Sequence, residues 1–325
     1  MSLSYEYSFG AVRAREKVLF SRADLETMLA FDSVKALTGY LKDKNYAEGD
    51  TLDELLQNSK KETLQYLFSV VPEPAVFDVL LYPNDAHNIK AVMKGLLAGV
   101  DYAPLLSEQC TVKAETVITA VKENKFSLLP ERYAEAAEKA YEVLAHTADA
   151  RLSDAYIDSA CMKAQLQAAA ASGIPFLDEY IRTDVFYKNV KIALRGAATA
   201  APLSYYETAL TDGLDGFDKK EVAAAALKGT DALTDYLSVK DVYGCRAAIE
   251  QFNESPAAFE KYADNLLMML ARERCRRSGT GAEAALGFFL AKAAEDRAVH
   301  MIAVGIETDA DKEITRERLR DIYGG

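Results

Sequence analysis

Residues 88–95 read NIKAVMKG, and two similar octapeptides occur later in the chain. NVKIALRG occupies residues 189–196 and AVHMIAVG occupies residues 298–305, so the copies start 101 and 109 residues apart. Apolar residues recur within each copy at helical spacing. Each copy ends in glycine, which readily adopts the left-handed conformation just past a helix. The pattern therefore predicts three helices that each end at this glycine.

A second phrase precedes each octapeptide. It reads LKDKNYAEG at residues 41–49, VKENKFSLL at 121–129 and YLSVKDVYG at 236–244. Between the two phrases the pattern predicts a helix, a turn that contains proline or glycine, and another helix. Short helical octapeptides also match by chance, and chance similarity is the alternative interpretation.

Two phrases in the same order three times indicate internal repetition. The repetition predicts three helical domains, at residues 1–103, 104–202 and 203–325. A period near one hundred residues is too long for the common helical solenoid repeats. Three similar domains in one chain can instead surround a pseudo-threefold axis, as in a cyclic trimer. Such an arrangement has a central opening.

The remaining segments also have helical character. Glycine and proline are sparse, at 17 and 8 residues, and we find no alternating strand pattern. TLDE from Thr51, SYYE from Ser204 and TGAE from Thr280 have the spacing of a capping box. Ser255 precedes Pro256, and proline is well suited to the first position of a helix. We therefore expect an all-α fold.

Charge and composition exclude several classes of function. The formal net charge of −12 argues against nucleic-acid binding and against unaided adhesion to an anionic membrane. No apolar stretch approaches the roughly 20 residues of a membrane span, and the N-terminal residues do not have the pattern of a signal peptide. The four cysteines are scattered, so we expect no disulfide framework.

Motifs of catalysis and of ligand binding are absent from the sequence. The three histidines, His87, His146 and His300, do not have the spacing of metal ligands. No phosphate-binding GxxxxGK[ST] motif and no GxSxG nucleophile motif occurs. We predict no catalytic residue, no cofactor and no metal.

Two basic stretches stand out in this acidic chain. ARERCRR occupies residues 271–277 and TRERLR occupies residues 315–320. One interpretation is a favourable charge at helix C-termini, with arginine stems covering apolar surface. The other is a docking surface for an acidic partner. The first is favoured for residues 271–277, whereas the second stretch leaves both open.

Four segments of this chain resemble the C subunits of archaeal and bacterial A/V-type rotary ATPases, which are the counterparts of the d subunits of vacuolar ATPases. The opening YSFGAVRAREKVLF is similar to the first helix of that family, and DAHNIKAVMKG resembles its D-x-x-N-I-K-x-x-x-x-G motif. NVKIALRG is similar to the second copy, although Asp184 lies five residues before Asn189, whereas Asp85 lies three before Asn88. The ending, from FFLAKAAEDRAVHMIAVG to TRERLRDIY, resembles the family's L-A-K-x-x-E and R-E-R-L-R-x-x-Y motifs. Ala298 and His300 depart from the asparagine and arginine usual in the third copy.

The resemblance implies a non-catalytic, funnel-shaped, all-helical protein of three related domains, without nucleotide site or cofactor. Proteins of this family sit on the cytoplasmic face of the membrane and join the central stalk to the proteolipid ring. They couple ATP hydrolysis or synthesis to ion transport as part of the rotor. We expect the stalk to enter the opening between the domains, and the opposite end to meet the proteolipid loops.

The resemblance and the charge pattern together suggest residues of the partner interface. The candidates are Arg13, Arg15, Arg316, Arg318 and Arg320. Two alternatives to the rotor role stay open. One is a helical interaction scaffold unrelated to rotary motors, and the other is an all-α enzyme with an unrecognised acidic pocket.

Overall fold

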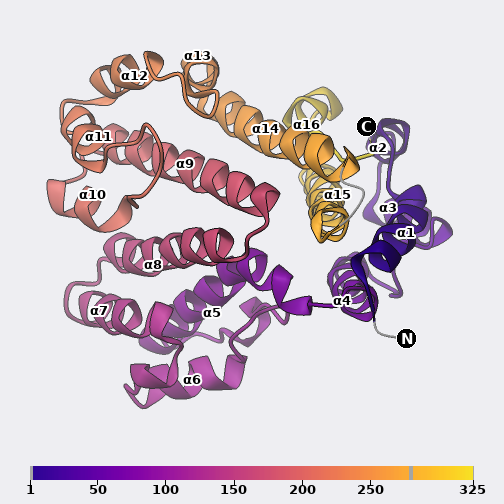
Figure 1. Ribbon diagram of the computed structural model, residues 1–325, viewed down its shortest axis with the longest axis horizontal. Helices are drawn as coiled ribbons and strands as arrows, with labels where there is room; N and C mark the ends of the chain where they lie inside the picture. Colours follow the sequence, from indigo (N-terminus) through magenta and orange to yellow (C-terminus); the bar gives the residue numbers. More distant parts are fainter. Residues whose placement is uncertain (1–2, 278–280, 325) are drawn as a thin grey trace. The chain divides into compact units, whose positions relative to one another are not determined.

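The computed structural model describes residues 3–277 and 281–324, and over these residues the protein is helical without any β-strand (Figure 1). This confirms the all-α prediction. The chain folds as two compact units. Unit 1 contains residues 1–76 and 251–325, and unit 2 contains residues 77–250. Unit 1 thus joins the two ends of the sequence, whereas unit 2 is continuous.

Unit 1 is built around its longest described helix, α15. Its helices are α1 (Tyr5–Arg15), α2 (Arg22–Leu29), α3 (Val34–Asp43), α4 (Leu52–Val70), α14 (Pro256–Arg277), α15 (Glu283–Glu307) and α16 (Lys312–Arg318), with a short 3₁₀ turn at Glu16–Val18. Helix α15 contacts all six of the others. Because α15 comes from the C-terminal segment and α1 to α4 come from the N-terminal one, neither segment has this core alone.

The core of unit 1 follows from the apolar stripe of α15. Val299, Ile302 and Ala303 recur at helical spacing and are at most 2% exposed. They pack with apolar residues of α2, α3 and α4, such as Met28 and Leu55. Small residues on α15 allow its neighbours to approach closely, as close packing in a helical core requires.

Unit 2 is arranged around α8. Its helices are α5 (Asp78–Ala98), α6 (Ala114–Lys122), α7 (Glu131–Thr147), α8 (Ala150–Ala171), α9 (Pro175–Ala198), α10 (Leu203–Ala209), α11 (Lys219–Ala226) and α12 (Thr230–Ser238), with 3₁₀ turns at Ala103–Leu105 and Phe126–Leu128. The 3₁₀ turn at Pro74–Phe77 and helix α13 (Cys245–Glu254) each cross a boundary between the units. Helix α8 lies between α5 and α9 and also contacts α7 and α10 (Figure 1).

The predicted helix starts are confirmed in two cases. Thr51 and Glu54 form the capping box of α4, and the Ser255 hydroxyl accepts a hydrogen bond from Ala258 N at the start of α14. The prediction for Ser204 was wrong, because α10 begins at Leu203 and Ser204 lies within it. Proline at residue 202 starts that helix instead. The capping box predicted at Thr280 lies outside the described residues.

The three octapeptides lie on helices that end in the same way, but not at the predicted glycine. Each helix continues for two or three residues past it. The residue four positions after the glycine has a positive φ, at Gly99 (66°), Ala200 (49°) and Asp309 (50°). The N–H of the next residue then donates to the glycine carbonyl, at 2.9 to 3.0 Å in all three. This is a Schellman motif, so the octapeptide glycine is three residues inside the helix cap.

Each octapeptide glycine makes a close contact instead. A Cβ atom on Gly95 would lie 2.6 Å from Tyr102 Cδ1, and one on Gly196 would lie 2.7 Å from Tyr206 Cε1. On Gly305 it would lie 2.7 Å from Oγ1 of the downstream threonine at position 315. Only glycine leaves room for the segment that follows the helix to fold back onto it.

The asparagines of the first two octapeptides hold the same returning segments. The Asn88 side chain exchanges two hydrogen bonds with the backbone of Ser107, at 2.8 and 3.0 Å. Asn189 makes the same pair with Thr211, at 2.9 and 2.7 Å. Both asparagines are completely buried, so each satisfies backbone groups that would otherwise be buried without partners. Alanine at position 298 in the third copy has no amide for this interaction.

These shared features are local, and they recur in both units. The three ranges predicted from the repeats have different boundaries from the two compact units, because residues 1–103 and residues 203–325 each include parts of both units. The three-domain organisation therefore stays a prediction.

Candidate functional site

Two of the predicted interface arginines hold the C-terminal segment against other helices of unit 1. Arg316 Nε donates to Glu26 Oε2 of α2 at 2.9 Å. Arg320 Nε donates to Asp264 Oδ2 of α14, also at 2.9 Å. Ion pairs at exposed positions contribute little to stability, because solvent screens them. Their main consequence is therefore the orientation of the two guanidinium groups.

Arg316 and Arg320 line one cleft of unit 1, which we name the C-terminal cleft. Its volume is about 340 Å³. Its charged lining residues are Arg22, Glu26, Lys261, Arg272, Arg316, Arg320 and Asp321. Five cations thus face two carboxylates within a chain of net charge −12. Such a lining complements an acidic group on a partner.

Sequence reasoning did not find all of the C-terminal cleft. Lys261 and Arg272 are eleven residues apart on α14, which places them on the same face three turns apart. This spacing could have identified the two residues from the sequence as neighbours on one helix face. Arg22, the first residue of α2, comes from the opposite end of the chain. Only the packing of α2 against α15 and α16 brings it to the cleft.

Arg13 and Arg15 do not line this cleft. Arg13 pairs with Glu16 Oε2 at 2.6 Å and donates to the carbonyl oxygen of Cys275 at 2.5 Å, so it joins α1 to α14. Arg15 is an exposed residue, and its guanidinium lies 5.2 Å from the ring centre of Tyr66 on α4, in a cation–π contact. Both side chains fix α1 on its neighbours.

Arg318 differs from the other four. It is exposed, and its side chain makes no hydrogen bond, ion pair or ring contact with any residue that the structure describes. Of the five predicted residues, two therefore line the same cleft and two lie on α1. Arg318 is close to the two cleft residues in sequence, but it is exposed at the surface. Whether any of them binds a partner stays a prediction.

The acidic and basic residues of the L-A-K-x-x-E motif are buried and belong to the core of unit 1. Lys292 Nζ binds Glu295 Oε2 at 2.9 Å. Asp296 accepts hydrogen bonds from the hydroxyl groups of Tyr46 and Ser59. Burial raises the pKa of both the Glu295 and the Asp296 carboxyl groups. This cluster ties α15 to the N-terminal segment and presents no surface to a partner.

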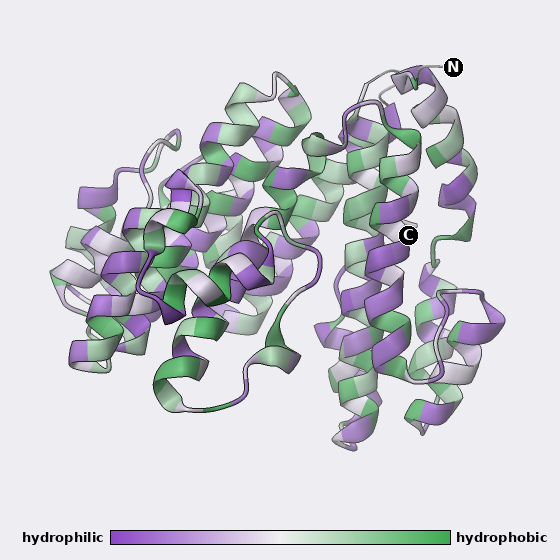
Figure 2. Ribbon diagram, turned by 90° about the horizontal axis from the view of Figure 1, so that it is seen from below, coloured by the Kyte–Doolittle hydropathy of each residue, from purple (hydrophilic) through white to green (hydrophobic). Residues whose placement is uncertain are grey.

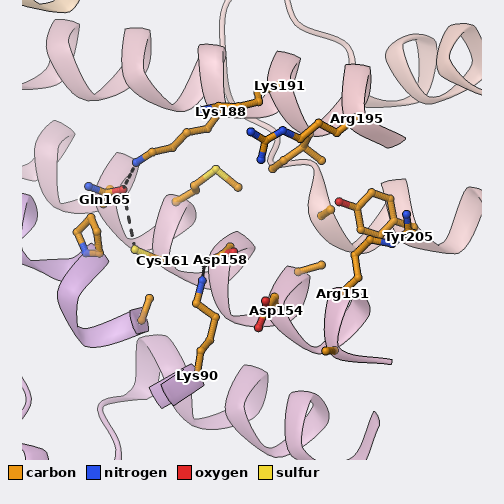
Figure 3. Close-up of a pocket in the computed structure, with 17 residues that line it drawn as sticks. Lys90, Arg151, Asp154, Asp158, Cys161, Gln165, Lys188, Lys191, Arg195 and Tyr205 are labelled. Carbon is orange, nitrogen blue, oxygen red and sulfur yellow. Dashed lines mark hydrogen bonds and ion pairs between the residues drawn. The ribbon is translucent and has the colours of Figure 1, made fainter. Parts of the chain in front are cut away.

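A second and larger cleft lies in unit 2 along α8, between α5 and α9 (Figure 3). We name it the α8 cleft, and its volume is about 630 Å³. The first octapeptide contributes Lys90, and the second contributes Lys191, Ile192 and Arg195, with Lys188 directly before it. The repeated sequence that positions the helices thus also supplies cations of this cleft.

Two further features bear on function. Among residues 3–277 and 281–324, no three His, Cys, Asp or Glu side chains are placed to hold a metal ion. The long helices carry hydrophobic and hydrophilic residues along their lengths (Figure 2), and no described helix is long and apolar enough to cross a membrane.

Over its described residues the protein is thus all-α, the segments that follow the repeated helices fold back onto them, and each of the two units has a charged cleft. The chain belongs to the family of ATP synthase (C/AC39) subunits, whose family model matches residues 9–318. No curated protein matches the chain at a significant level. The family match confirms the resemblance seen in the sequence, and membership implies association with other ATP synthase subunits.

Proposed function

We propose that this protein is a non-catalytic central-stalk component of a V/A-type rotary ATPase. In this proposal it joins the foot of the central stalk to the membrane proteolipid ring and couples ATP hydrolysis or synthesis to ion transport. The observation that carries the proposal is the family match, which spans residues 9–318. Attachment to the cytoplasmic side of the plasma membrane would be peripheral, through protein contacts.

The contacts at the helix ends are evidence in favour of a subunit that transmits torque. A rotor adaptor must resist twisting, and loops between helices are normally the mobile parts of a fold. Here the segments after α5 and α9 are held by buried asparagine side chains, and a tyrosine packs on the glycine of each helix. These contacts restrict the connections on which a torsional load would act.

The same features support the proposed division into three related domains, at residues 1–103, 104–202 and 203–325. Three helices about one hundred residues apart share a Schellman ending and a close glycine contact. In the proposal the three domains surround an opening that receives the stalk, and the opposite end meets the proteolipid ring. Interfaces of obligate complexes commonly bury more than about 2,000 Å², so both ends would contribute broad surfaces.

We place part of the partner interface at the C-terminal cleft and at Arg318. Arg316 and Arg320 are oriented by their ion pairs, and Arg318 is exposed without a partner among the described residues. The proposed interface also includes Arg13 and Arg15, which lie in the last turn of α1. An acidic surface on a stalk or ring protein would complement these groups, because charged rims steer association and set orientation.

The test is assembly of the complex with charge-reversed variants. We expect Arg318→Glu alone, and more strongly Arg316→Glu with Arg318→Glu, to reduce co-purification of stalk and proteolipid subunits by about tenfold or more. Because the side chain of Arg318 makes no contact within the described chain, the far-UV circular dichroism of the Arg318→Glu variant should match the wild type.

The matched control is Lys220→Glu with Lys228→Glu, two exposed cations of unit 2 without side-chain partners among the described residues. It should assemble like the wild type. Normal assembly of the variant with both Arg316→Glu and Arg318→Glu would contradict the proposed interface. Failure of the wild-type chain to capture any stalk or ring protein would overturn the function itself and favour a scaffold unrelated to the motor.

A further inference from the structure

The core of unit 1 contains a cluster of charged side chains on α15. Glu295 and Asp296 are 2% and 4% exposed, and Lys292 is 9% exposed. The Lys292 ammonium group lies 2.9 Å from a Glu295 oxygen and 3.9 Å from the ring centre of Tyr46. Two buried carboxyl groups thus share one buried cation. Because an unbalanced charge is costly where water is excluded, the composition of this cluster favours the uptake of one proton.

The hydrogen bonds of the cluster indicate which carboxyl group holds the proton. The ionised form of Glu295 is satisfied, because Oε1 accepts from a backbone N–H of the N-terminal segment and Oε2 binds the lysine. Asp296 accepts only from neutral groups, the hydroxyls of Tyr46 and Ser59, and both of them donate to Oδ1. Within the described residues, no donor reaches Asp296 Oδ2. A proton on Oδ2 leaves both hydrogen bonds intact, since the carbonyl oxygen Oδ1 has two lone pairs.

The other groups around Asp296 do not replace this proton. The charge of Lys60 on α4 acts on Asp296, but Lys60 is an exposed residue and solvent weakens its effect. Tyr323 packs on α15, and burial raises its pKa to about 12, so it is uncharged near neutral pH. The buried residues of the helices packed on α15 are uncharged, among them Val12 of α1, Met28 of α2, Leu41 of α3, Met268 of α14 and Thr315 of α16.

We propose that Asp296 keeps a proton in the folded protein at neutral pH, and that this proton makes the packing of the N-terminal segment on α15 sensitive to pH. The cluster joins α15 to this segment at three places, namely the backbone N–H of Phe20 and the hydroxyl groups of Tyr46 and Ser59. Loss of the proton leaves an uncompensated negative charge at this join, which destabilises the folded state of unit 1.

The direction of the pH dependence follows from the difference between the folded and the unfolded chain. Burial is the largest influence on the Asp296 carboxyl group and raises its pKa, whereas an aspartate of an unfolded chain has a pKa of about 4. Between these two values the folded state binds one proton more than the unfolded state. The contribution to stability is complete below the unfolded value and is lost as the pH rises through the folded value. Over this interval the unfolding equilibrium constant should rise by up to about tenfold per pH unit.

The experiment is urea unfolding of the full-length protein, followed by circular dichroism between about pH 5 and pH 9. Asp296→Asn replaces the protonated carboxyl group by a neutral amide of similar shape, whose oxygen still accepts from both hydroxyl groups. The variant should lack the proton-linked rise. We therefore expect the ratio of the wild-type unfolding constant to that of Asp296→Asn to increase by about tenfold or more across this range.

The matched control is Asp43→Asn. Asp43 is an exposed residue at the end of α3 in the same unit, and its side chain has no partner among the residues that the structure describes. Both substitutions change an aspartate to asparagine, but only one of them lies in the buried cluster. The Asp43→Asn variant should keep the pH dependence of the wild type.

Infrared spectroscopy provides a second measurement that needs no stable variant, because a protonated carboxyl group has a C=O stretching band that a carboxylate lacks. We expect this band in the wild type at about pH 7, where exposed carboxyl groups are ionised. It should be absent from Asp296→Asn and should disappear where the ratio of unfolding constants levels off. The proposal is overturned if the wild type lacks the band, or if Asp296→Asn keeps the wild-type pH dependence. Neither result bears on the proposed role in the rotor, which the assembly experiment tests.

Discussion

Single glycines determine where this fold can be tightly packed. Gly95, Gly196 and Gly305 were predicted to end their helices, and instead they lie inside the helices against a downstream side chain. The repeated glycine correctly marked a position that requires glycine. The sequence alone did not show whether the reason is a left-handed backbone conformation or a close contact with another side chain. That distinction depends on which residue folds back, and Tyr102 and Tyr206 are seven and ten residues further along the chain.

Replacement of these glycines by alanine should destabilise the protein. Gly95→Ala places a methyl group 2.6 Å from the Tyr102 ring and 2.7 Å from its Cβ atom, which lies too close to the backbone to move freely. Overpacking of this kind costs about 1–3 kcal/mol. Urea unfolding followed by circular dichroism measures the change in unfolding free energy.

The control is Gly39→Ala, because a Cβ atom there has no heavy atom within 4 Å and the residue lies inside α3. This change should stabilise the protein by about 0.5–1 kcal/mol through the higher helix propensity of alanine. If Gly95→Ala were as stable as the wild type, the close contact would not constrain the position.

At the scale of the element, the position of a helix terminus depends both on the local sequence and on contacts with segments further along the chain. The starts at Thr51 and Ser255 follow local rules, since the capping hydroxyl is three residues from the N–H that donates to it. The ends are less local. Gly99 and Ala200 occupy the same left-handed position of equivalent helices, yet only one of them is the residue type that favours it.

This mismatch predicts opposite effects of two substitutions. Gly99→Ala introduces a left-handed alanine and should destabilise unit 2 by about 1–2 kcal/mol. Ala200→Gly relieves the same strain, partly offset by the greater freedom of glycine in the unfolded chain, and should stabilise it by up to about 1 kcal/mol. Both positions are exposed, and neither change removes a buried contact. Thermal unfolding of the two variants measures the difference; shifts in the same direction would contradict the shared Schellman geometry.

At the scale of the whole molecule, the order of segments along the chain differs from their grouping in space. Unit 1 combines residues 1–76 with residues 251–325, and α15 of the second segment supplies the apolar face for helices of the first. Glu295 and Asp296 add buried polar contacts between the two segments, since Glu295 accepts a hydrogen bond from Phe20 N and Asp296 accepts one from the Ser59 hydroxyl. The buried apolar cluster of α5 to α8 in unit 2 lies within residues 86–161 and includes neither segment.

The two units should therefore differ when cut from the chain. A fragment of residues 77–250 should fold alone and unfold cooperatively in urea. A fragment of residues 1–76 should have low helicity by circular dichroism, because its apolar faces lack α15. Mixing it with a fragment of residues 251–325 should restore helicity. Cooperative folding of residues 1–76 alone would contradict the shared core.

The sequence by itself determined the all-α class, the family and the position of the repeated helices, because helical periodicity and capping are local and survive in a linear pattern. It also marked Arg316 and Arg320, through the concentration of charge near the C-terminus. Only the tertiary structure decided that the octapeptide glycines are packing positions and that Arg22, Lys261 and Arg272 share a cleft with those arginines. Likewise, it placed Lys90 and the cations of α9 on opposite walls of one cleft. The physical reason is that these relations join residues of different helices, and their proximity follows from how the helices pack.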